Sequence, residues 1–107
     1  MTFSQIGDIV NSTGLPNVYD HFTTSPAPPY VVFTTPNQND FHADNENYCG
    51  KTWVYVELFA KKRDFTSEGK IETALRNAGL SWFKSVDYLN DENIYQTTYE
   101  TEVILNG

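Results

Sequence analysis

The sequence lacks positive charge at both of its ends. Residues 1–50 contain five acids and no Lys or Arg, and residues 85–107 again contain five acids and no base. All seven bases lie between Lys51 and Lys84, so the formal net charge of −7 divides into two acidic ends and a mildly basic middle. Because a grip on nucleic-acid phosphates needs clustered Lys and Arg, this pattern argues against a nucleic-acid-binding protein. It suits a chain that lies near nucleic acid without adhering to it.

Cysteine is also scarce, and long apolar runs are missing. The single cysteine, Cys49, excludes an internal disulfide framework and favours a reducing compartment. The first residues, MTFSQIGDIV, have no basic region followed by an apolar run, so we expect no signal peptide. No stretch approaches the roughly 18 apolar residues of a membrane span. The length of 107 residues predicts one domain, residues 1–107.

Aromatic residues are what the chain does have. It contains seven Tyr, seven Phe and two Trp, although only 39 % of its residues are hydrophobic. Each aromatic ring can bury roughly 150–250 Å². A few well-placed rings therefore supply much of one modest core.

The first segment predicts a helix that begins at Thr2 and ends at Gly14. Thr2 and Gln5 form a T-x-x-Q capping box. An apolar stripe with spacings of three and four follows: Phe3, Ile6, Ile9 and Val10. Pro16 bars continuation of the helix, and residues 17–29, which include the run SPAPP, are expected to form a loop.

Two β-prone runs follow. Residues 30–35 (YVVFTT) predict a strand that Pro36 closes, and the polar residues 37–47 allow a short strand at 41–43. Residues 53–61 are the clearest strand, with Val54, Val56, Leu58 and Ala60 on one face and Trp53, Tyr55, Glu57 and Phe59 on the other. Because both faces are largely apolar, we expect this strand to be central, with its second face covered by a neighbouring subunit.

A second helix is predicted after Lys61-Lys62-Arg63. Asp64, Thr66 or Ser67 caps it, and Gly79 ends it. Its expected buried stripe is Ile71, Ala74, Leu75 and Ala78, and Glu72 with Arg76 is expected to form an i,i+4 ion pair. Residues 82–89 then predict a strand, residues 90–93 a turn, and residues 94–105 a long final strand whose odd-numbered residues share one face.

The element order is therefore α-β-(β)-β-α-β-β. It predicts an α+β fold, a two-layer sandwich in which two helices pack on a mainly antiparallel sheet of four to five strands. The expected core, from the shared periodicities, consists of Ile9, Val10, Val54, Val56, Leu58, Ile71, Leu75, Tyr99 and Val103.

Little of the sequence suggests chemistry. Asp40, His42 and Asp44 alternate, and on a strand they would share one face and could bind a divalent metal. A solvated polar loop is the favoured interpretation, because one such triplet matches no ligand template. The chain has no nucleophile elbow and no Gly-rich phosphate loop. We therefore expect no enzyme activity, no cofactor and no metal.

The run Lys61-Lys62-Arg63 has two interpretations. It can protect a strand end from aggregation and keep it soluble. It can also be a docking patch that steers association with an acidic protein surface. The sequence leaves both open.

Several short motifs in a fixed order carry a family resemblance. They are Gly14-Leu15-Pro16 with Tyr19-Asp20-His21-Phe22, Pro28-Pro29-Tyr30-Val31-Val32-Phe33, Phe41-His42-Ala43-Asp44-Asn45, Val56-Glu57-Leu58-Phe59 with Lys61, Glu72-Thr73-Ala74-Leu75 and Tyr95-Gln96-Thr97-Thr98-Tyr99-Glu100. Over nearly the whole chain this order resembles the small tail-terminator proteins of long-tailed bacteriophages, also called tail-completion or tail-to-head joining proteins. Cys49 and Gly50 depart from the pattern, since bulkier strand residues are expected there.

The resemblance implies a non-enzymatic virion protein of the tail-neck region, assembled in the host cytoplasm. It would form a ring, expected to be a hexamer, on the head-proximal end of the tail tube. There it would contact the tube protein, stop tube polymerisation and offer a joining surface to the head-tail connector or head-completion protein. DNA would pass through an acidic lumen without specific binding, and no membrane would be involved.

On this interpretation the candidate site residues form three sets. Lys61, Lys62 and Arg63 would bind a partner protein. The aromatic residues Trp53, Tyr55 and Phe59 would lie in the subunit interface, and Glu100 and Glu102 would face the lumen. Two other functions fit the sequence as well: an acidic DNA-mimic inhibitor of the anti-restriction or anti-CRISPR type, and a head-completion or neck protein.

Overall fold

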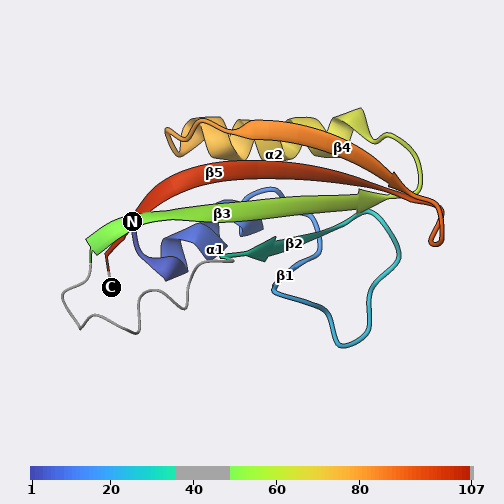
Figure 1. The fold of residues 1–107 in the computed structure, drawn as a ribbon, viewed down its shortest axis with the longest axis horizontal. Coiled ribbons are helices and arrows are strands. Elements are labelled where there is room, and N and C mark those ends of the chain that lie inside the picture. The colour runs from blue at the N-terminus through green and yellow to red at the C-terminus, as the bar shows by residue number, and fades with distance from the viewer. Residues whose placement is uncertain (36–48, 107) are drawn as a thin grey trace.

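The fold is an α+β sandwich, as the element order predicts. The computed structural model describes residues 1–35 and 49–106. Its elements are α1 (Phe3–Asn11), β1 (Asn17–Tyr19), β2 (Tyr30–Thr34), β3 (Cys49–Ala60), α2 (Phe65–Asn77), β4 (Phe83–Leu89) and β5 (Ile94–Asn106). Figure 1 shows the two helices against a sheet whose long strands β3 and β5 run the length of the molecule. The possible strand at 41–43 lies outside the described residues.

Over the described residues the sheet has five strands in the order β1-β2-β3-β5-β4. Only the pair β1–β2 is parallel, and the other three pairs are antiparallel. β3 therefore lies at the centre, as predicted, with β2 on one side and β5 on the other. The prediction that it begins at Trp53 is wrong, because β3 begins at Cys49, where its backbone pairs with Asn106 at the end of β5.

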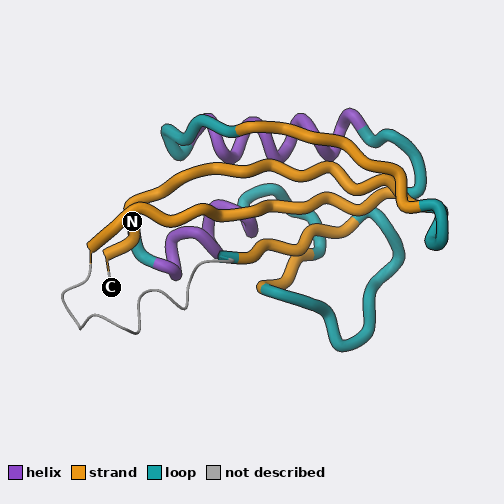
Figure 2. Tube along the Cα trace, in the orientation of Figure 1, coloured by secondary structure: helices purple, strands orange, loops and turns teal. Residues whose placement is uncertain are grey.

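The prediction of a continuous loop over residues 17–29 is also wrong, because β1 lies within it. The backbone N–H of Val31 donates to the Pro16 carbonyl at 2.8 Å, and that of Asp20 donates to the Phe33 carbonyl at 2.9 Å. These bonds join β1 to β2, and a three-residue strand has too little periodicity to be read from sequence. The rest of the predicted segment does form a loop, which extends from the edge of the sheet (Figure 2).

Both helices begin where the sequence indicates. The hydroxyl of Thr2 accepts the Gln5 N–H at 3.2 Å, and the Gln5 side chain accepts the Thr2 N–H at 2.7 Å, which completes the capping box. Asp64 is the cap of α2, because its carboxylate accepts the Ser67 N–H at 3.0 Å. Within α1 the buried residues are Ile6 and Val10, whereas Ile9, predicted in the core, is only half-buried.

The second helix ends in the predicted glycine cap. Gly79 has φ +76°, its N–H donates to the Arg76 carbonyl at 2.9 Å, and the Leu80 N–H donates to the Leu75 carbonyl at 3.0 Å. This is a Schellman motif. Leu80 also packs against the core, so the end of the helix is held by apolar contact as well as by hydrogen bonds.

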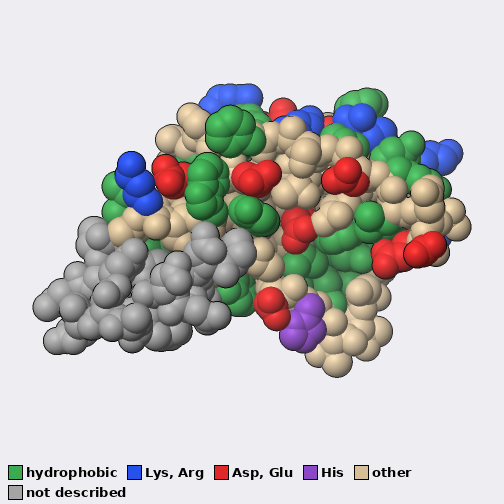
Figure 3. All heavy atoms as spheres, in the orientation of Figure 1, with side chains coloured by type: hydrophobic (Ala, Val, Ile, Leu, Met, Phe, Trp, Pro, Cys, Tyr) green, Lys and Arg blue, Asp and Glu red, His purple; other side chains and the backbone are tan. Residues whose placement is uncertain are grey.

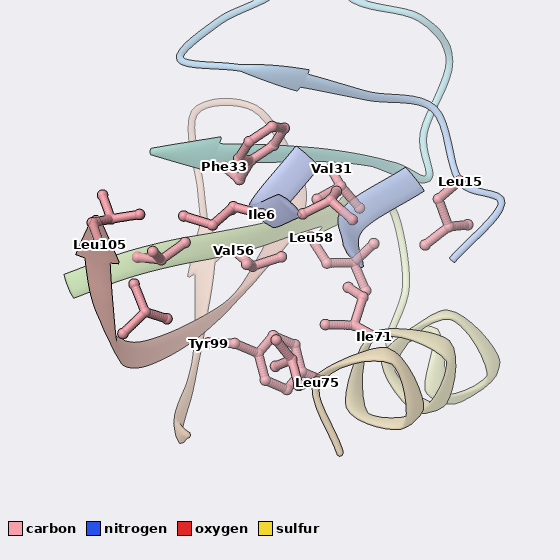
Figure 4. Packing of buried hydrophobic residues seen from close by; sticks show 13 residues of the cluster. Ile6, Leu15, Val31, Phe33, Val56, Leu58, Ile71, Leu75, Tyr99 and Leu105 are labelled. Carbon is pink, nitrogen blue, oxygen red and sulfur yellow. The ribbon is translucent and has the colours of Figure 1, made fainter. Parts of the chain in front are cut away.

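The core lies between the helices and one face of the sheet. Figure 4 shows Ile71 and Leu75 of α2 beside Tyr99 of β5, with Val56, Leu58 and Val31 on the neighbouring strands. Along β3 the even-numbered residues from Thr52 to Ala60 are all buried, and the odd-numbered ones are half-buried or exposed. The face with the odd-numbered residues of β3 is the one that the helices leave uncovered, and we call it the open face.

Candidate functional site

The open face combines aromatic rings with carboxylates. In the antiparallel register Trp53 lies opposite Glu102, and Tyr55 lies opposite Glu100. On the other side of β5, Phe83 of β4 also lies opposite Glu100. Residues directly opposite on antiparallel strands point to the same side of the sheet. Figure 3 shows this mixture as red acidic side chains among green hydrophobic ones across the molecule.

The three aromatic residues predicted for a subunit interface do share this face. Trp53, Tyr55 and Phe59 are all half-buried within the single chain. However, Phe59 stacks on Tyr30 with ring centroids 5.2 Å apart, and Tyr30 contacts Phe22 edge-on at 5.4 Å. The chain therefore covers the Phe59 end of the open face with its own rings. Among the described residues, the Trp53 end has Phe83 of β4 as its one ring partner, at 6.3 Å.

The two acids predicted to line a lumen lie on the same face as these rings. Glu100 is half-buried and Glu102 is exposed. A partner that covers Trp53 must also cover Glu102, its opposite residue, so one end of the open face cannot be both subunit interface and lumen wall. The sequence could not reveal this conflict, because strand register is a tertiary property.

A third acid of the open face is already engaged. Glu57 accepts a hydrogen bond from the amide of Gln96 on β5. Burial raises the pKa of Glu57, and the Gln96 bond only partly opposes that rise. Burial thus weakens the tendency of Glu57, at the centre of this face, to carry a negative charge.

The basic run is split by the fold. Lys61 and Lys62 are exposed at the end of β3. Arg63 instead binds Glu68 of α2 through two bonds, from Nε to Oε2 at 3.1 Å and from a terminal nitrogen to Oε1 at 3.2 Å. Its guanidinium also lies 4.7 Å from the ring centre of Phe65. Only the two lysines of the predicted docking patch are thus fully available to a partner.

A buried cluster of charges that the sequence did not predict lies between α2 and the sheet. Glu68 is only 2 % exposed. Besides Arg63, it binds Nζ of Lys84 at 2.8 Å, and the same Nζ binds Glu72 at 2.8 Å. The hydroxyl of Tyr99 donates to Glu72 at 2.8 Å. The signal was present in the sequence, because Glu68 precedes Ile71 by three residues and Leu75 by seven and so shares their buried stripe.

The cluster keeps its carboxylates ionised. Burial alone would raise the pKa of Glu68, but the hydrogen bonds and charges of Arg63 and Lys84 outweigh burial and lower it. The bond to Lys84 lowers the pKa of Glu72, and the bonds to Glu68 and Glu72 raise the pKa of Lys84. Burial, followed by the bond to Glu72, raises the pKa of Tyr99. Each charge is paired within the chain, so the cluster fastens β4 to α2 and offers no free group for catalysis.

The predicted ion pair of Glu72 with Arg76 is wrong, because Glu72 binds Lys84 and Tyr99 instead. Arg76 lies over the ring of Trp82, with 5.8 Å between its guanidinium carbon and the ring centre. The i,i+4 spacing places two side chains on one helix face but does not exclude better partners on the sheet.

The candidate metal triplet Asp40, His42 and Asp44 lies outside the described residues. Within residues 1–35 and 49–106, no three His, Cys, Asp or Glu side chains are grouped closely enough to hold a metal ion. In the same part of the chain no helix is long and apolar enough to cross a membrane.

Comparison with known proteins adds no assignment. No protein-family model matches the sequence, and no curated protein matches it. Two features of the structure therefore bear on function. One is the open face with its Trp53 end, and the other is the pair of exposed lysines at the end of β3.

Proposed function

We propose that this chain is the subunit of a ring that closes the head-proximal end of a long-tailed phage's tail tube. The ring, expected to be a hexamer, stops polymerisation of the tube protein. It then offers the surface to which the head-tail connector or head-completion protein joins. DNA passes through its lumen, and the protein acts without catalysis.

The uncovered Trp53 end of the open face carries this proposal. Trp53 is half-buried and Phe83 is 70 % exposed, although both are large aromatic residues. An exposed apolar patch rimmed by polar groups marks an interaction site. A ring built from one kind of subunit needs two different complementary surfaces on each copy. The open face and the lysines at the end of β3 are two such different surfaces. The order of the sequence motifs, which resembles that of tail terminators, is the second support for the proposal.

The charge of the chain suits a channel for DNA. Fourteen acids against seven bases leave a surplus of negative charge on the protein. An acidic wall repels phosphates and lets DNA slide, whereas a basic wall retains it in a salt-dependent manner. Since Trp53 and Tyr55 share their face with Glu100 and Glu102, we assign this end of the face to the subunit contact. The lumen is then lined by other acids of the chain.

The DNA-mimic function receives less support from the geometry. Such an inhibitor presents carboxylates at phosphate-like spacing on one exposed face. Here aromatic side chains separate the acids of the open face, and Glu57 is half-buried and bonded to Gln96. A large apolar area between the charges favours a protein interface over a mimic of the DNA backbone.

The test is deletion of the gene from the phage that encodes this chain. We expect lysates with free filled heads and with tails of uncontrolled length, because tube growth has lost its terminator. Electron microscopy of the particles measures both. Supplying the wild-type gene in trans during infection should restore heads joined to tails of normal length.

Two results would contradict the proposal. One is a deletion lysate with normal-length tails joined to heads. The other is binding of the purified protein along the sides of tail tubes, rather than at one end, in gold-labelled micrographs. A protein that instead inhibits a restriction nuclease or a CRISPR nuclease in purified assays would establish the DNA-mimic function.

A further inference from the structure

A depression lies at the Trp53 end of the open face. It has a volume of about 520 Å³, and its walls include Trp53, Trp82, Phe83, Glu100 and Glu102. Trp53 and Phe83 approach each other at 6.3 Å between ring centres. The chain between α2 and β4, residues 79–82, forms the remaining wall. The depression therefore joins β3, β5 and the start of the edge strand β4.

The chemistry of these walls suits an organic cation. Aromatic faces attract Lys or Arg within about 6 Å of the ring centre, and Trp is the strongest of the three aromatic residues in this role. Carboxylates add charge-assisted hydrogen bonds. Within the described residues no ion pair involves Glu100 or Glu102, so their charges are not neutralised by a direct contact inside the chain. Lys51 lies on the same face, opposite Ile104, which is two residues beyond Glu102 along β5.

The chain itself carries a matching surface. Lys61 and Lys62 are exposed at the end of β3, and Phe65 nearby is 69 % exposed. We call these three residues the basic corner. Like the depression, it combines charge with an exposed ring, although Arg63 lies over one face of Phe65, and its charge has the opposite sign.

Within one chain the two surfaces cannot meet. Ala60, the residue before Lys61, pairs with Tyr95 on β5. Glu100 and Glu102 lie five and seven residues further along the same strand, which corresponds to roughly 17 and 24 Å at about 3.4 Å per residue. A contact between the basic corner and the depression must therefore join two copies.

We propose that the basic corner of one copy docks into the depression of the next copy. Lys61 and Lys62 lie against the rings and carboxylates of Trp53, Phe83, Glu100 and Glu102, and Phe65 covers apolar surface beside them. The contact joins two different surfaces, so repetition generates a ring or an open helix rather than a closed pair. It rests on the proposed ring function and names the residues through which neighbouring subunits of that ring touch.

The test is a reciprocal reversal of charge. K61E/K62E makes the basic corner acidic, and E100K/E102K makes the depression basic. Sedimentation velocity of the concentrated wild-type protein should show an associated species that each double variant alone loses, because like charges now face each other. An equimolar mixture of the two variants should regain it, since every contact between unlike copies is again complementary. Alternation of the two variants closes a ring with an even number of subunits.

Control variants reverse exposed charges that lie in neither surface. D8K changes an exposed acid of α1, and K70E changes an exposed lysine of α2. Both should associate like the wild type. Circular dichroism and melting temperature establish that every variant folds.

The proposal is overturned if the wild-type protein stays monomeric at the highest concentration tested, or if both double variants associate normally. Failure of the mixture to regain the associated species overturns it as well. If the wild-type monomer binds a lysine-rich peptide that E100K/E102K does not bind, the depression serves another basic protein and not a second copy. If the wild type and both variants all cap tail tubes normally, this contact is refuted and the proposed function stands. If the mixture regains association but no form of the protein binds tubes, the contact stands and the proposed function is refuted.

Discussion

Lys84 is the residue of β4 through which the edge strand is fastened to α2. Every residue of β4 before Leu89 is exposed, so β4 gains little from apolar packing. Lys84 reaches Glu68 and Glu72 at 2.8 Å each. Lys84→Met keeps most of the aliphatic length of the side chain and removes the charge, which leaves Glu68 with Arg63 alone.

The expected loss in the free energy of unfolding follows from the burial of this cluster. Removal of one partner from a buried ion pair costs about 3–5 kcal/mol. Glu68 retains Arg63, and 33 % of the Lys84 side chain is exposed to screening solvent. We therefore expect a loss of about 1.5–3 kcal/mol in the free energy of unfolding at pH 7.

The loss should depend on pH in a defined direction. The folded-state pKa values of Glu68 and Glu72 lie below their ordinary value of 4.5. Stability from these carboxylates is therefore present above that value and disappears as the pH falls through the lowered folded-state pKa values. Lys84→Met raises both pKa values toward or above the ordinary value. The difference from wild type should be largest at neutral pH and should shrink progressively below about pH 4.5.

Urea denaturation followed by tryptophan fluorescence at several pH values measures this difference. Lys70→Met, an exposed lysine of the same helix, is the matched control and should change stability by less than about 0.5 kcal/mol. A Lys84→Met effect as small as that control would refute the idea that the cluster fastens β4. An effect of the expected size that does not change with pH would show that altered packing at this position, and not the loss of the Lys84 charge, causes it.

Three further predictions concern the fold. Leu58→Ala should cost about 2–5 kcal/mol in denaturant melts, because Leu58 is 1 % exposed, and a cost below about 0.5 kcal/mol would remove it from the core. Gly79→Ala should cost about 1 kcal/mol because residue 79 has a positive φ. Gly69→Ala should stabilise the protein by about 0.5–1 kcal/mol, because Gly69 lies within α2 and has open space for a Cβ. Thermal melts in which both variants shift the melting temperature in the same direction would contradict this. Asp64→Ala should cost about 1 kcal/mol at pH 7. Bonds from Ser67 lower the pKa of Asp64, so this loss should fade as the pH drops below 3.8, and a pH-independent loss would argue against a charged cap.

Local signals predicted most of the elements. The capping box at Thr2, the glycine cap at Gly79 and the alternation along β3 each depend on neighbouring residues, and each is confirmed. The short strand β1 and the early start of β3 depend on backbone bonds to distant strands. Those bonds leave no periodicity in the sequence, so the predicted boundaries there were wrong.

The candidate site too was predicted only in part from the sequence. The sequence placed Trp53, Tyr55 and Phe59 on one strand face, and that placement is confirmed. It could not show that Tyr30 stacks on Phe59, nor that Arg63 is bound to Glu68. Which rings and charges remain free for a partner is a matter of contacts between elements.

The sequence by itself determined the α+β class, the starts of both helices, the glycine cap of α2 and the division of charge along the chain, because these follow from residue types at short spacing. The predicted end of α1 at Gly14 is wrong, because the helix ends at Asn11 with Ser12 as its C-cap. Only the tertiary structure decided how β5 registers against β3, and therefore that Glu100 and Glu102 share a face with Trp53 and Tyr55. It also decided that Lys84 crosses from β4 to two glutamates of α2. Register and long side-chain contacts depend on the packing of all elements at once, since a slip of one residue would move every side chain of a strand to the opposite face.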